Sequence, residues 1–269
     1  MVPKEEVDCL RKRWDELCAT LKINSGACAR WGQYLLDEYS AHERQYHTLR
    51  HLSELFWHLD RATANGWLAR PDNVALAIWF HDVIYHGKNK DDEEASAIEF
   101  ERFGEEVGLE ASDTASVAAW IRLTATHKCS EAAHGRDCCF FMDFDMAILG
   151  KPWGRSWEGC PVAPETGYSD YALRDVIVEY RKLHRFPAVL APFFVGGVWC
   201  WGRARFLTSA GSPFTTAEYR KLYEAEAQQN VGKELDHWQS VQRRVLWWSR
   251  AAAALATAAS TAWAVRFFR

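Results

Sequence analysis

The chain of 269 residues has no large excess of one charge and no paired cysteine motif. Its formal net charge of −4 gives no sign of a nucleic-acid-binding protein, so no nucleic-acid partner is expected. None of its eight cysteines forms a C-x-x-C pair, and the adjacent Cys138 and Cys139 suit neither a disulfide with each other nor a structural zinc site. The first residues are charged, unlike a signal peptide. We therefore expect reduced, mostly buried thiols in a cytoplasmic protein.

Strand alternation, internal repeats and low-complexity linkers are also absent from the sequence. Apolar residues recur at helical spacing instead, and the longest irregular stretch is residues 151–167. We expect an all-α fold, with one domain over residues 1–244 and an Ala-rich helical tail over residues 245–269. Helices are expected over residues 5–23, 26–40, 43–64, 71–85, 91–103, 112–127, 143–149, 168–183, 187–207 and 215–244.

The tail contains an uncharged run, residues 251–265, which is mostly Ala, Thr and Ser between flanking arginines and aromatics. A membrane-spanning helix needs roughly 20 apolar residues, so this run is short for one. One interpretation is a helix that packs on the domain or on a partner, including a second copy of the chain. The alternative is membrane association, as a marginal anchor or an interfacial helix. The sequence leaves the oligomeric state open.

Four clusters of ionisable residues lie in apolar, helical surroundings. The most informative is the His81-Asp82 pair within residues 79–83, because two ionisable residues inside a buried helix are costly unless something compensates them. His47 and His51 are four residues apart, which would place both on one helix face. The remaining clusters contain His127 and the pair Asp143 and Asp145. Imidazoles and carboxylates without thiolates favour a divalent ion among Mn²⁺, Mg²⁺, Fe²⁺, Co²⁺ and Zn²⁺.

The order of these clusters resembles the HD-domain superfamily of metal-dependent phosphohydrolases, an all-α fold whose ligands follow the order His…His-Asp…Asp. The similarity is closer to a branch of uncharacterised, predicted metal-dependent HD phosphohydrolases, and it covers roughly residues 10–237. The chain departs from that branch at Asp92, where Asn is usual, in the length of residues 151–167, and in its tail. The motifs that carry the similarity are Tyr46-His47-Thr48-Leu49-x-His51, Trp79-Phe80-His81-Asp82-x-x-Tyr85, Asp91-Asp92-Glu93-Glu94-x-Ser96-Ala97, Leu123-Thr124-x-x-His127, Asp143-Phe144-Asp145-x-Ala147-Ile148-Leu149-Gly150, Glu179-Tyr180 and Glu224-x-x-Ala227-x-x-Asn230.

The resemblance implies a helical HD bundle with a metal held by His47, His81, Asp82 and Asp145. Asp143 is an alternative to Asp145, because two residues so close in a helix point to different sides. For His51 and His127 three roles stay open: ligand of a second ion, hydrogen-bond donor to the substrate, and general acid. Glu93 would orient water, support a ligand histidine or cap its own helix. The candidates to bind phosphate are Arg44, Lys88, Lys90 and Lys128, each alternatively a solvated surface charge.

The leading functional hypothesis is therefore hydrolysis of a small phosphomonoester, with a nucleotide as the commonest substrate class in the superfamily. Two alternatives belong to other classes. A di-iron oxygenase would use the same helices with a second metal ion, and so would need extra ligands such as His51 and His127. A non-catalytic, nucleotide-sensing module would combine the core with a tail that docks on a membrane or a partner.

Overall fold

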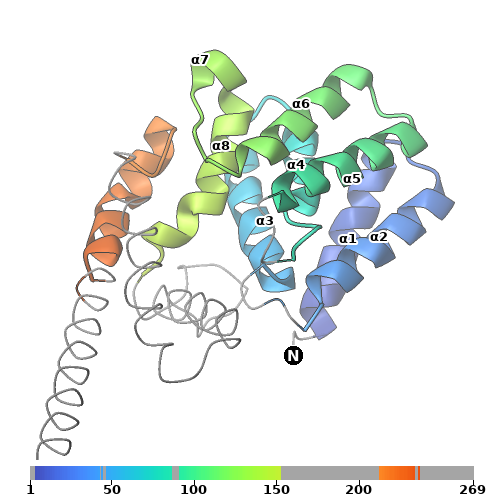
Figure 1. Cartoon of the computed structure of the whole chain (residues 1–269), viewed down its shortest axis with the longest axis horizontal. Helices are drawn as coiled ribbons and strands as arrows, with labels where there is room; N and C mark the ends of the chain where they lie inside the picture. The colour runs from blue at the N-terminus through green and yellow to red at the C-terminus, as the bar shows by residue number, and fades with distance from the viewer. Residues whose placement is uncertain are drawn as a thin grey trace, which may run out of the picture. The chain divides into compact units, whose positions relative to one another are not determined.

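The structure, a computed structural model, describes residues 4–42, 44, 47–86, 91–152, 212–233 and 236. All regular structure in this part of the chain is helical, which confirms the predicted all-α class (Figure 1). Residues 217–233 are also helical. The labelled helices are α1 (Lys4–Thr20), α2 (Ser25–Tyr39), α3 (Leu49–Ala64), α4 (Pro71–Phe80), α5 (Asp92–Val107), α6 (Ala111–Leu123), α7 (Glu131–His134), α8 (Arg136–Met146) and the 3₁₀ helix η1 (Ala147–Gly150).

The chain divides into two compact units. The first comprises Met1–Asp175 and Ser212–Ala227 and contains every labelled helix, whereas the second comprises Val176–Gly211 and Gln228–Arg269. The helices expected over 168–183 and 187–207, and the tail over 245–269, lie outside the described residues. Within the described ranges, no helix combines the length and the apolar content that crossing a membrane requires.

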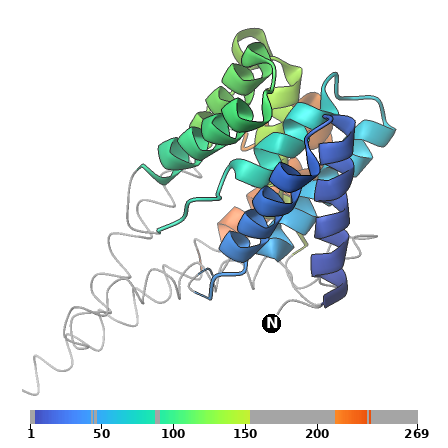
Figure 2. The same ribbon diagram turned by 90° about the vertical axis from the view of Figure 1, so that its right-hand side faces the viewer.

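Helix α4 is the centre of the first unit. Every residue from Asn73 to Phe80 is buried, as expected for a helix that is apolar on all sides. It packs on α3, α5, α6 and α8, and Figure 2 shows it between the α5–α6 pair and the α1–α2 pair. Trp79 and Phe80 contact Trp14 of α1 at ring-centroid distances of 5.6 and 6.3 Å. The end of α4 is therefore held from several sides.

The helix that carries His51 begins later than the sequence predicts. α3 starts at Leu49, not at residue 43, and the preceding Thr48 is extended, with φ −116° and ψ 179°. His47 therefore lies in the segment before the helix, and the expectation that His47 and His51 share one helix face is wrong. A helix cannot run through the extended backbone of Thr48, so α3 starts after it. The Arg44 side chain holds the preceding segment against the chain beyond α4.

The helix that precedes Asp82 ends earlier than predicted. α4 stops at Phe80, so His81 is its C-terminal cap and Asp82 lies in the following turn, not inside a helix that continues to residue 85. The reason is a tertiary hydrogen bond: the Asp82 backbone N–H donates to the Tyr39 hydroxyl at 3.2 Å. Likewise α6 ends at Leu123, and His127 follows in a turn. The chemistry-bearing residues thus lie at helix ends.

Candidate metal centre

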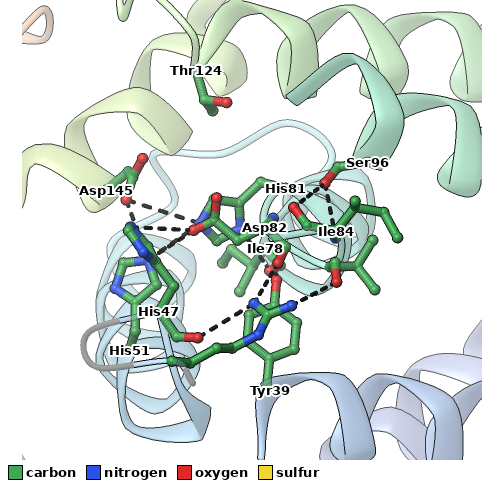
Figure 3. Close-up of polar contacts among 12 residues, drawn as sticks. Tyr39, His47, His51, Ile78, His81, Asp82, Ile84, Ser96, Thr124 and Asp145 are labelled. Atoms are coloured by element: carbon green, nitrogen blue, oxygen red, sulfur yellow. Dashed lines mark hydrogen bonds and ion pairs between the residues drawn. The ribbon is translucent and has the colours of Figure 1, made fainter. Parts of the chain in front are cut away.

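Six ionisable side chains converge beside the C-terminal end of α4, and Figure 3 shows all of them except His127. Two come from that end itself, His81 and Asp82. α3 contributes His51 from its first turn, and the segment before it contributes His47. The other two are Asp145 from α8 and His127 from the turn after α6. All the histidines and aspartates that the sequence proposes as metal ligands or catalytic groups, except Asp143, are thus brought together.

Three of these residues form a compact group. His51, His81 and Asp145 each offer one ligand atom, and these atoms lie within 4.8 Å of one another. His51 Nε2 lies 3.2 Å from His81 Nε2 and 3.3 Å from Asp145 Oδ1. Two ligands of one ion, each about 2.0–2.2 Å from it, lie roughly 3–3.5 Å apart. The third pair, His81 Nε2 and Asp145 Oδ1, is 3.9 Å apart, so the three donor atoms form a group that could hold a divalent ion.

Asp82 also lies beside this group, and it is the residue of the cluster that His47 contacts. Asp82 Oδ2 is 3.0 Å from His81 Nε2, 3.6 Å from His47 Nε2 and 3.9 Å from His51 Nε2. His51, which the resemblance leaves ambiguous, therefore contacts both His81 and Asp145, whereas His47 contacts Asp82. In the sequence, the only clue to this pair is the four-residue spacing of His47 and His51. This spacing does not tell which of the two is the better candidate ligand.

A backbone carbonyl orients His81. Its Nδ1 lies 3.0 Å from the Ile78 carbonyl oxygen. Because a carbonyl only accepts, Nδ1 carries the hydrogen, and in the neutral ring Nε2 presents its lone pair to the cluster. A hydrogen bond of this kind on the far nitrogen is what orients metal-binding histidines in general.

The charges of the cluster are strongly coupled. Burial alone lowers the pKa of His81, but Asp82, by charge and hydrogen bonding, and Asp145 outweigh it and raise that pKa to about 9. For His47 burial dominates and lowers the pKa to about 4. Burial opposes ionisation of both aspartates, yet the neighbouring imidazoles hold the pKa of Asp82 and of Asp145 below the usual range. Two largely buried, ionised carboxylates are thus stabilised by imidazole protons or by a cation beside them.

Arg44 supports the turn that carries Asp82. Its guanidinium donates to the carbonyl oxygens of Asp82 at 2.6 Å and Val83 at 2.7 Å, and it lies 4.9 Å from the centroid of the Tyr39 ring. The side chain is almost fully buried. These contacts direct the guanidinium at the backbone of the turn, whereas the sequence suggests a contact with phosphate.

His127 has an unusual backbone conformation. Its φ is +53°. Residues other than glycine seldom adopt this backbone conformation, which costs of order 1 kcal/mol. The conformation brings Nε2 to 2.8 Å from Asp145 Oδ2. His127 therefore holds the oxygen of Asp145 that faces away from His51.

The two aspartates of α8 have different partners. Asp143 is fully buried and accepts hydrogen bonds from the backbone N–H groups of Thr215 at 2.6 Å and Thr216 at 2.8 Å, and from the Thr216 hydroxyl at 2.6 Å. Burial raises its pKa to about 6, against these hydrogen bonds. Asp143 thus fastens the start of the helical residues 217–233 to α8. Asp145, not Asp143, faces the cluster.

The remaining predicted residues lie elsewhere. Glu93 is half-buried in the first turn of α5 and makes no hydrogen bond or ion pair with any of the six clustered residues, all of which are described. Lys128 is exposed beside His127. Lys88 and Lys90 lie outside the described residues.

Comparison of the chain with models of protein families, with curated proteins and with solved structures finds no match in any of the three. The likeness to the HD-domain superfamily therefore stays a prediction that its motifs carry. Independently of that likeness, the structure has a buried group of His51, His81 and Asp145 that could hold a metal ion.

Proposed function

We propose that the chain is a metal-dependent phosphohydrolase that acts on a small phosphomonoester, with nucleotides as the leading substrate class. The observation that carries the proposal is the buried group of His51, His81 and Asp145, whose ligand atoms lie within 4.8 Å of one another. The cluster alone supports only a metal, and the phosphate chemistry comes from the motif resemblance. Nitrogen and oxygen donors without sulfur suit Mn²⁺, Mg²⁺, Fe²⁺, Co²⁺ or Zn²⁺.

A divalent ion at this cluster would lower the pKa of water and polarise a phosphoryl oxygen, which are the two needs of phosphate-ester hydrolysis at neutral pH. The chain supplies the ligands and their support. His81 presents Nε2, because its Nδ1 donates to Ile78. Asp82 lies beside it at 3.0 Å, and Arg44 holds the turn that carries Asp82. His127 is the residue we assign as general acid for the leaving oxygen.

Phosphate release from a panel of phosphomonoesters, including nucleoside monophosphates, tests the proposal. Each of the five ions is added in turn to the metal-stripped full chain. We expect turnover with at least one ion, and loss of turnover to background in His81→Ala and Asp82→Ala. A matched control is His134→Ala, because His134 is an exposed histidine of α7 outside the cluster. Stoichiometric metal binding without turnover on any member of the panel would contradict the proposal.

A di-iron oxygenase is the second candidate, and the surroundings of Asp145 favour it. Its Oδ1 lies 3.3 Å from His51 Nε2, and its Oδ2 lies 2.8 Å from His127 Nε2. A carboxylate with an imidazole at each oxygen has the donor arrangement for bridging two ions, as in carboxylate-rich metal sites of helical bundles. Two irons per chain, oxygen consumption and no phosphate release would decide for this candidate.

A further inference from the structure

Three cysteines gather where the segment after α6 meets α8. Cys129 is half-buried in that segment, whereas Cys138 and Cys139 are buried in α8, and all three are free thiols. Cys129 Sγ lies 2.8 Å from Cys139 Sγ and 3.7 Å from Cys138 Sγ. The two adjacent cysteines of α8 therefore compete for one partner, and the shorter distance favours Cys139.

We propose that Cys129 and Cys139 form a site of reversible oxidation, at which a disulfide fastens the segment carrying His127 to α8. A disulfide bond is about 2.05 Å long, so the two sulfurs need to approach each other by about 0.8 Å. Because Cys129 lies between helices and not within one, a rotation of its side chain or a small shift of its backbone can supply this movement. The distance to Cys138 requires about twice the movement.

The oxidant that we assign is a small-molecule disulfide such as oxidised glutathione. One thiol displaces a glutathione thiol and forms a mixed disulfide, and the second protein sulfur then displaces the other. One S–S bond breaks and one forms, and both protein thiol hydrogens end on the two glutathione molecules. The reverse exchange with reduced glutathione restores the thiols.

The environment makes the first of these steps slow. A hydrogen bond with Cys138, followed by burial, raises the pKa of the Cys129 thiol to about 12. The hydrogen bond with Cys129 and burial likewise raise the pKa of Cys139. Thiolate is therefore scarce at neutral pH, and the first exchange is slow. Once a mixed disulfide has formed, the second protein sulfur already lies beside it. Because the first exchange is slow, the quantity to measure is the amount of disulfide at equilibrium.

The position of the pair links it to the candidate metal centre. Cys129 follows His127 by two residues, and Cys139 precedes Asp145 in the same helix. His127 and Asp145 already connect these two segments through a contact of 2.8 Å. A disulfide would add a covalent connection between them and restrict the conformation in which His127 holds its positive φ.

Thiol mapping of the full chain in glutathione buffers tests the site. Trypsin cleaves after Lys128 and Arg136, so the two cysteines fall in different peptides that only a disulfide joins. After equilibration in an oxidising buffer and alkylation of free thiols, we expect the joined peptides in the wild type and in Cys138→Ser. We expect none in Cys129→Ser or Cys139→Ser. The joined peptides should also disappear from the wild type when reduced glutathione is added.

Persistence of the joined peptides in Cys139→Ser would assign the bond to Cys138 and overturn the proposal, as would their absence from the oxidised wild type. Amide hydrogen exchange over residues 124–130 tests whether the disulfide restricts the segment that carries His127. We expect slower exchange in the oxidised wild type than in the reduced wild type, and no change between oxidising and reducing buffer in Cys139→Ser. Equal exchange in the two wild-type forms would refute the restriction of the His127 segment.

Discussion

Helix α3 carries two buried histidines with contrasting surroundings. His51 and His58 are 2% and 1% exposed, so burial does not distinguish them. His51 faces His81 and the carboxylate of Asp145. By contrast, the Nδ1 of His58 lies 2.8 Å from the Tyr219 hydroxyl, and its ring stacks on Phe144 at 5.9 Å. The same residue type on one helix is thus a candidate ligand in one place and part of an aromatic core in the other.

The ionisation of the two environments differs in the same way. Burial lowers the pKa of His58 to about 3, and the charges of Arg61 and Lys151 act in the same direction. His81, which is equally buried, has a pKa raised to about 9, because Asp82 and Asp145 outweigh its burial. Carboxylate neighbours, and not burial, therefore mark a buried histidine as a candidate metal ligand.

Replacing each histidine of α3 in turn is the strongest test of this contrast. We expect His51→Ala to weaken metal binding by more than the roughly 10–100-fold that loss of a supporting residue costs. His58→Ala should leave metal affinity within a few-fold and lower the free energy of unfolding by about 2–4 kcal/mol, since it opens a cavity and removes the partner of Tyr219. Metal titration and urea unfolding of both variants measure the two effects. Loss of metal binding in His58→Ala, with binding retained in His51→Ala, would contradict the assignment of His51 as the ligand and His58 as a core residue.

Arg44 near the cluster and Arg61 near His58 allow a second test of the same contrast, with a smaller expected effect. Arg44→Lys keeps the charge but loses the planar fork that bonds the carbonyls of Asp82 and Val83, so we expect metal affinity to fall by about 10–100-fold. The matched control is Arg61→Lys, because Arg61 donates to Tyr223 beside His58. Its metal affinity should match the wild type. Unchanged metal affinity in a folded Arg44→Lys chain would contradict the inference that Arg44 supports the metal site.

Asp143 and Asp145 repeat the contrast within α8. Asp143→Asn puts an amide N–H where the backbone N–H groups of Thr215 and Thr216 now donate, and we expect it to lower the free energy of unfolding by about 1–3 kcal/mol. Metal affinity should be retained, whereas Asp145→Asn should lose it. Chemical unfolding with metal titration measures both. Metal loss in a stable Asp143→Asn chain would show that the wrong aspartate had been assigned to the cluster.

The sequence predicts the helical class and the order of the clusters, because apolar periodicity and motif order are local properties of the chain. It places His81-Asp82 within a helix, because the Tyr39 hydroxyl and Arg44, which bond the turn after α4, are 43 and 38 positions away along the chain. A helical pattern cannot register bonds from such distant residues.

The choice between neighbouring candidates was also beyond the sequence. Thr215 and Thr216 bind Asp143 from 72 and 73 positions away, which leaves Asp145 for the cluster. The preference for His51 over His47 follows from the contacts of His51 with His81 and Asp145, which lie 30 and 94 positions further along the chain. Residue type and order were therefore predictable, and the partners of each side chain were not.

The smallest expected effect concerns the pH dependence of stability at His58. Its pKa is about 3 in the folded chain and 6.5 when unperturbed, so between these values the unfolded chain binds a proton that the folded chain does not. The stability from neutral His58 is complete above pH 6.5 and falls with decreasing pH, by up to about 1.4 kcal/mol per pH unit. His58→Phe should remove this part of the slope in urea unfolding between pH 7 and 5. The exposed His134→Gln should retain it, and equal slopes in wild type and His58→Phe would mean that His58 is charged in its aromatic surroundings.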